Sequence, residues 1–133
     1  MGLAVLVASL SLAACTKNGE AFESFQRVNA ERSGQGLPGL QLDDALVAKA
    51  QAWAETLAAT GSVRHSGLTD GAPADWQFLA ENVGSATSVA EMHGLFMGSP
   101  HHRDNILDGR PTRIGTGAAM AGGRVYVVQE FAA

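Results

Sequence analysis

The sequence contains a single cysteine among 133 residues, and this shortage excludes several classes of small protein. Cys15 alone can form no internal disulfide and no cysteine-based metal centre. Charged residues are also few, at 17%, and the nine Lys and Arg residues form no basic cluster. A nucleic-acid partner is therefore not expected. With 46% hydrophobic residues, the chain has the composition and length of one globular domain.

The sequence also lacks an apolar run long enough to span a bilayer. Residues 3–14 are apolar but number fewer than the roughly 20 that a spanning helix needs, and they suit the hydrophobic core of a signal peptide. The run ends in Leu12-Ala13-Ala14-Cys15, which resembles a lipobox, where bacterial lipoproteins are cut and acylated. No Lys or Arg precedes it, unlike most signal peptides. The alternatives are an ordinary secretory signal and an apolar helix with a buried cysteine.

These features predict a signal peptide with a lipobox over residues 1–15, a short linker over 16–19 and a folded domain over 20–133. The linker would hold an acylated protein within about 15 Å of its membrane, at 3.3–3.6 Å per extended residue. The expected location is extracytoplasmic, in the periplasm or at the cell surface, as a lipoprotein with the membrane as partner. The alternative is a secreted protein.

Helical patterns dominate the first two thirds of the domain. Apolar residues at helical spacing predict a helix over 20–32, and a second helix begins at Asp43 and ends before Gly61. The stripe Leu46, Ala50, Trp53 and Leu57 on this second helix is predicted to face the core, with Trp53 packed inside. Ser88 to Glu91 forms a capping box that opens a third helix, and Ser99-Pro100 opens a fourth.

Strand patterns come last. Between the helices, residues 61–87 predict loops with one short strand at about 78–83. Residues 113–120 and 124–131 then flank a Gly-containing gap of hairpin length. Both faces of this hairpin are apolar or small, which indicates a sheet covered by helices on both sides. Helices followed by strands predict the α+β class.

The motifs of common enzymes are missing: there is no His-Glu-x-x-His, no Gly-x-Ser-x-Gly and no phosphate-binding loop. A different set of landmarks is present. In chain order these are Asn29-Ala30-Glu31-Arg32, His65-Ser66, Glu81-Asn82-Val83-Gly84, Ser99-Pro100-His101-His102-Arg103 and Thr112-Arg113-Ile114-Gly115. In this order they resemble bacterial members of the CAP superfamily (cysteine-rich secretory proteins, antigen five and pathogenesis-related proteins), over residues 22–131.

The resemblance implies a three-layer α-β-α sandwich with a small antiparallel central sheet. It also implies a cleft that holds two histidines and two acidic residues. By position, the two histidines are His65 and His102 and the first acid is Glu81, while His101 takes the place of a common glycine. The second acid is missing from its usual position, where Ser99 stands instead. Two imidazoles and one carboxylate would suit a divalent cation such as zinc, or a general base without metal.

Each of these residues also has a structural interpretation. Glu81 and Asn82 could hold loop amides and shape the cleft, and His65 could be an ordinary loop residue. His93 is expected to be structural. Glu130 could pair with Arg113 or Arg124 across the hairpin.

The first functional hypothesis is a non-enzymatic extracytoplasmic module that binds a small apolar or cell-envelope ligand and a divalent cation at His65 and His102. The alternative is a protease-like hydrolase that uses Glu81 as its base, with His65 and His102. The missing second carboxylate and the lack of an obvious nucleophile favour the first. A cell-surface interaction module cannot be separated from it by sequence, because a fold does not fix an activity.

Overall fold

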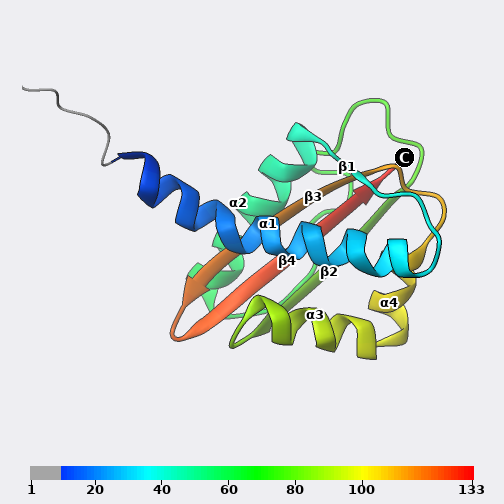
Figure 1. Cartoon of the computed structure of the whole chain (residues 1–133). Helices are drawn as coiled ribbons and strands as arrows, with labels where there is room; N and C mark the ends of the chain where they lie inside the picture. The colour runs from blue at the N-terminus through cyan, green and yellow to red at the C-terminus, as the bar shows by residue number, and fades with distance from the viewer. Residues whose placement is uncertain (1–9) are drawn as a thin grey trace, which may run out of the picture.

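The computed structural model describes residues 10–133, and their side chains from residue 19 onward. Four helices and four strands follow the order α1 (Leu10–Gly34), β1 (Gln41–Leu42), α2 (Asp44–Thr60), β2 (Leu79–Ala86), α3 (Val89–Gly98), α4 (Pro100–Leu107), β3 (Arg113–Ala121) and β4 (Arg124–Ala132). The sheet has the strand order β1-β3-β4-β2. Helix α2 covers one face, while α1, α3 and α4 cover the other (Figure 1). The predicted α+β class and three-layer sandwich are confirmed.

Helix α2 packs directly on the hairpin strand β3. Its N-cap is Asp43, whose side chain accepts a hydrogen bond from the N–H of Leu46, and the left-handed Gly61 ends it. Gly115 on β3 faces this helix so closely that an added Cβ would lie 2.0 Å from the main chain of Leu46. The glycines of β3 are therefore needed for the close approach of the helix.

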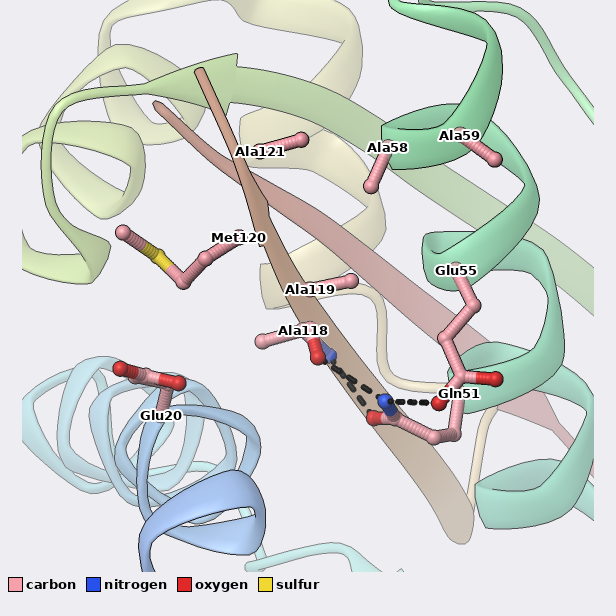
Figure 2. Close-up of a pocket in the computed structure, with 9 residues that line it drawn as sticks. All are labelled: Glu20, Gln51, Glu55, Ala58, Ala59, Ala118, Ala119, Met120 and Ala121. Atoms are coloured by element: carbon pink, nitrogen blue, oxygen red, sulfur yellow. Dashed lines mark hydrogen bonds between the residues drawn. The ribbon is translucent and has the colours of Figure 1, made fainter. Parts of the chain in front are cut away.

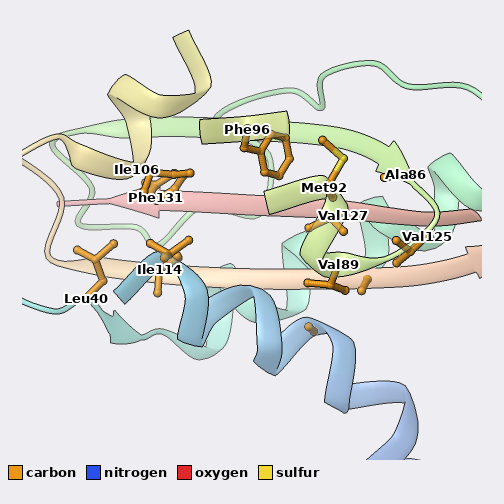
Figure 3. Packing of buried hydrophobic residues seen from close by; sticks show 13 residues of the cluster. Leu40, Ala86, Val89, Met92, Phe96, Ile106, Ile114, Val125, Val127 and Phe131 are labelled. Carbon is orange, nitrogen blue, oxygen red and sulfur yellow. The ribbon is translucent and has the colours of Figure 1, made fainter. Parts of the chain in front are cut away.

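The hairpin and the core also follow the sequence pattern. Gly122 and Gly123 have φ values of 56° and 74°, as a two-residue hairpin turn requires. The larger core lies between the sheet and helices α1, α3 and α4 (Figure 3). Its fully buried members include Phe96, Ile114 and Phe131. A second cluster, with Leu57 and Val128, fills the space under α2.

The motif Asn29-Ala30-Glu31-Arg32, near the end of α1, has a structural role. The amide of Asn29 bonds both main-chain groups of Leu40, at 3.1 and 2.8 Å. Arg32, 1% exposed, donates to the carbonyls of Ile106 and Asp108 and so ties α1 to the end of α4. These contacts account for the motif without any catalytic or ligand-binding role.

Three details differ from the predictions. Helix α1 already includes residues 16–19, because residues 10–18 hold no glycine or proline that would break a helix. Strand β1, which makes the sheet mixed rather than purely antiparallel, was missed because two residues carry no periodicity. Trp53 is only half-buried, and its indole N–H donates to the carbonyl of Arg64 at 2.9 Å. The inner position is taken by Ala54, at 0% exposure.

The predicted signal peptide and lipidation site are not tested. Residues 1–9 and the side chain of Cys15 lie outside the described part of the chain. Among the described helices, none combines the length and the apolar character that crossing a bilayer demands.

Candidate functional site

The candidate site lies at the edge of the sheet formed by β2, which pairs with β4 and is contacted by the loop of residues 61–78 through the Glu81 side chain. Side chains alternate along β2, so Glu81 points to the α2 face and Asn82 to the face of the other helices. The two residues thereby organise two separate hydrogen-bond networks.

Glu81 is held by the loop that crosses β2. Its Oε1 accepts from Nδ1 of His65 at 2.7 Å and from the main-chain N–H of Ser66 at 3.0 Å. Its Oε2 accepts from the Ser66 hydroxyl. An ionised carboxylate can only accept, so the proton of the His65 ring lies on Nδ1. The family resemblance implied that His65 and Glu81 share one cleft, and in the structure they are in contact.

A second carboxyl group faces Glu81 from the neighbouring strand. Glu130 of β4 is paired with Glu81 in the β2–β4 register and is 2% exposed. The predicted pairing of Glu130 with Arg113 or Arg124 is wrong. Arg113 pairs with Asp43 and Asp75 instead, and Arg124 bonds Ser85.

The two carboxyl groups share one proton. Burial raises the pKa of Glu130 to about 10, helped by the hydrogen bond to Glu81 and by its charge. Burial also pushes the pKa of Glu81 upward, but hydrogen bonds from Glu130, Ser66 and His65 outweigh it, and the pKa is lowered. Glu81 is therefore a carboxylate at neutral pH and Glu130 an uncharged acid, as expected for two carboxyl groups in one buried site.

The network on the other face is a chain of amides. Gln129 donates to the hydroxyl of Ser24, Asn82 donates to Oε1 of Gln129, and Asn105 donates to Oδ1 of Asn82, at 3.0, 3.0 and 2.9 Å. Asn82 also donates to the carbonyl of His102 at 3.1 Å. This chain fixes α4 against β2 and β4, so Asn82 has the structural role that one interpretation of the sequence gave it.

A cavity of about 330 Å³ opens beside these networks. Its polar lining comes from His65, Glu81, His101, Asn105 and Arg110, and its apolar lining from Leu68, Phe78, Leu79 and Ala80. Ser66 completes the wall.

The two adjacent histidines of α4 lie differently with respect to this cavity. His101 lines it, whereas the His102 ring packs on Phe96 with centroids 5.1 Å apart. Burial lowers the pKa of His102, and the nearby charges of His101 and His65 lower it further. His102 thus lies near the site but is not among the residues lining the cavity.

The described residues supply an incomplete ligand set for a metal. Among the side chains from residue 19 to 133, no group of three or more His, Cys, Asp or Glu residues is placed to hold an ion. The Nδ1 atom of His65 is occupied by Glu81, which leaves Nε2 of this 59% exposed side chain for a ligand. A closed zinc site with four protein ligands does not fit these residues.

Two other expectations can be compared with the structure. Ser99, at the usual position of the second acid, is the N-cap of α4 and does not line the cavity. His93 is buried on α3 and contacts Glu31 at 3.0 Å, in agreement with a structural role. Glu130 was missed, because only the strand register reveals that it faces Glu81.

Comparison with known proteins identifies a family and a relative. Residues 25–131 match the family described as "CAP: Cysteine-rich secretory protein family". The uncharacterized protein YkwD of Bacillus subtilis (strain 168) is 32% identical over 103 residues, which are 71% of this chain but only 40% of that relative. The chain therefore spans well under half of the relative's length.

Solved structures have the same fold. An outer surface protein of Borrelia burgdorferi superposes with a TM-score of 0.78 at 15% identity, over 87% of this chain and 93% of that one. An extracellular protein with an SCP domain from Bacillus anthracis str. Ames gives 0.75 at 23% identity, over 95% and 45%. These bacterial proteins are described as outer surface or extracellular.

Proposed function

The chain belongs to the CAP family of cysteine-rich secretory proteins, and on this premise we propose that it is a non-enzymatic binding module acting outside the cytoplasm. The proposal rests on the hydrogen bonding and the lowered pKa of Glu81. Its two oxygens accept three hydrogen bonds from His65 and Ser66, and its pKa is lowered. A general base needs a free lone pair and a pKa near the working pH. Together with the hydrogen bond from Glu130, these bonds occupy all four lone-pair sites of the Glu81 carboxylate. Glu81 therefore meets neither requirement, and this speaks against the hydrolase alternative.

The cavity beside Glu81 is the proposed ligand site. Aromatic and aliphatic side chains form one part of its wall, while His65, His101 and Arg110 offer hydrogen-bond donors. This mixture suits a small ligand with an apolar body and an anionic or hydrogen-bond-accepting end, such as a component of the cell envelope.

A divalent cation is the second proposed ligand. The hydrogen bond from His65 to Glu81 fixes the ring as a carboxylate fixes a metal-binding histidine, with Nε2 left to coordinate. His102 remains the proposed second ligand. Because two side chains make an open site, the ion would be exchangeable rather than resident.

Similar proteins and the first residues of the chain support a location outside the cytoplasm. Relatives are extracellular or outer surface proteins, and Leu12 to Cys15 resembles a lipobox. We therefore propose export and acylation at Cys15. Intact-mass analysis of the membrane fraction should detect a lipid-modified N-terminus that Cys15→Ser abolishes, and an unmodified soluble protein would refute the anchor.

Titration calorimetry tests the binding site, with sodium decanoate, decanol and zinc chloride as probes. We expect decanoate to bind more tightly than decanol, and Arg110→Gln to remove that preference. Zinc binding should weaken as pH falls through about 6.5, because ligation needs neutral imidazole. The binding-module proposal would be refuted if the wild type bound neither the amphiphiles nor zinc.

Variants assign the zinc ligands. His65→Ala and His102→Ala should each abolish most binding, and Glu81→Gln should weaken it about 10–100-fold by releasing the His65 ring. His101→Gly should keep it. Loss of binding in His101→Gly with retention in His102→Ala would show that His101, which lines the cavity, is the second ligand.

A further inference from the structure

The opposite edge of the sheet carries a second surface. Strand β1 covers β3 only at Arg113 and Ile114, so the rest of the β3 edge has no partner strand among the described residues. A cavity of about 460 Å³ opens along residues 118–121, between the C-terminal half of α2 and Glu20 of α1 (Figure 2). The sites at β2 and at β3 are separated by the width of the sheet.

The side chain of Gln51 occupies part of this edge by hydrogen-bonding to the main chain of β3. Its amide donates to the carbonyl of Ala118 at 2.9 Å and accepts from the N–H of Ala118 at 3.0 Å, as Figure 2 shows. A neighbouring β-strand would make the same two bonds. Main-chain groups on a strand point the same way at every second residue, so those of Met120 also point outward. No described residue bonds them.

The shape of the edge leaves room for another main chain. Alanines make up most of the wall, and Met120 at the centre has 55% of its surface exposed. Natural proteins usually protect such an edge with charge, proline or a covering segment. From Ala118 to Ala121 the edge runs about 10 Å at 3.4 Å per residue, enough for a segment of three or four residues.

Charge indicates what kind of segment fits. Glu20 of α1 and Glu55 of α2 line the two flanks of the cavity, and no basic side chain of the described residues lines it. Two copies of this chain paired edge to edge would bring like carboxylates together, which disfavours a homodimer. An extended segment with Lys or Arg side chains would instead find opposite charges on both sides.

We propose that this edge binds an extended cationic polypeptide segment by β-strand addition. The segment pairs with the free N–H and C=O of Met120, displaces Gln51 from Ala118, and places basic side chains near Glu20 and Glu55. Main-chain bonds supply affinity in this mode and the flanking groups supply selectivity. This site is independent of the ligand cavity at β2.

A blocked hexapeptide of alternating lysine and valine tests the proposal. In ¹⁵N-resolved NMR titrations of the full chain, we expect shifts at the amides of Ala118 and Met120 and slower hydrogen exchange at Met120. A copy of the peptide N-methylated at alternate residues cannot pair with a strand edge and should bind at least tenfold more weakly. A peptide with glutamate in place of lysine should bind as weakly.

Variants separate strand addition from general charge attraction. The double change Glu20→Gln and Glu55→Gln should weaken binding at least tenfold, while Glu91→Gln, an exposed carboxylate on α3, should leave it unchanged. Gln51→Ala should strengthen binding, because it removes the internal competitor for Ala118. The proposal would be overturned if the N-methylated peptide bound as tightly as the unmodified one, or if the shifts lay away from β3. It would also be overturned if self-association of the free chain already protected the Met120 amide from exchange.

Discussion

Glu130 lies directly opposite Glu81 across the β2–β4 pair, and both side chains are buried on the side of the sheet that α2 covers. An uncharged acid thus faces a carboxylate, and the carboxylate in turn anchors His65 and Ser66 of the loop that forms the cavity wall. The wall of the cavity is therefore held by a carboxylate that faces an uncharged acid on the neighbouring strand.

Glu130→Gln is expected to stabilise the protein at neutral and alkaline pH. The folded pKa of about 10 lies above the unfolded value near 4.5, so the folded state binds more protons and stability falls as pH rises between the two. An amide keeps the hydrogen bond to Glu81 without that penalty, which amounts to about 3 kcal/mol at pH 7. Denaturant unfolding from pH 5 to 9 should show a flatter profile than the wild type.

Glu55→Gln is the matched control, since it removes an exposed carboxylate on α2, and its pH profile should follow the wild type. If Glu130→Gln also followed the wild type, Glu130 would be ionised in the fold, and the shared proton would be refuted.

The sequence was enough to predict the fold and to bring His65 and Glu81 together, but not to predict that Glu130 faces Glu81. Helix caps at Asp43 and Ser88 and the glycine turn of the hairpin are local signals, and the structure confirms them. His65 and Glu81 were paired because the order of motifs matched a known family. Glu130 could not be recognised, since a glutamate near the end of an apolar strand usually faces solvent. Its burial depends on register and proton sharing, which no local pattern encodes.

Asn82→Ala is expected to destabilise the protein by about 2–4 kcal/mol. The substitution leaves Gln129 and Asn105 without their partner, and a buried polar group without a hydrogen bond costs about 1–3 kcal/mol. Asn105→Ala, at the half-buried end of the same chain, should cost about 1 kcal/mol. Urea denaturation checks both values. Similar costs for the two variants would contradict the expectation that the buried centre of the amide chain stabilises the fold more than its half-buried end.

Trp53→Ala and Leu57→Ala should differ although the residues occupy one helix. Trp53 is half-buried, with Arg64 5.0 Å above its ring, and we expect a loss of about 1–2 kcal/mol. Leu57 has no exposed surface, so its truncation should cost about 2–5 kcal/mol. A larger loss at Trp53 in denaturant unfolding would restore the sequence-based view that the indole belongs to the core.

The last prediction concerns His102, whose ring packs on Phe96 beside two other histidines. Burial, and then the charges of His101 and His65, lower its pKa below the ordinary value of 6.5. A lowered folded pKa means that His102 contributes stability above pH 6.5 and that this contribution is lost as pH falls through the folded pKa. In chelator-containing buffer, the NMR titration midpoint of the His102 ring should therefore lie below 6.5. His101→Gly should raise that midpoint, because it removes a neighbouring positive charge and loosens the packing, while Arg124→Gln at the far end of the hairpin should not move it. A midpoint at or above 6.5 would place the ring in water or beside a carboxylate, and the packing on Phe96 would then have to be rejected.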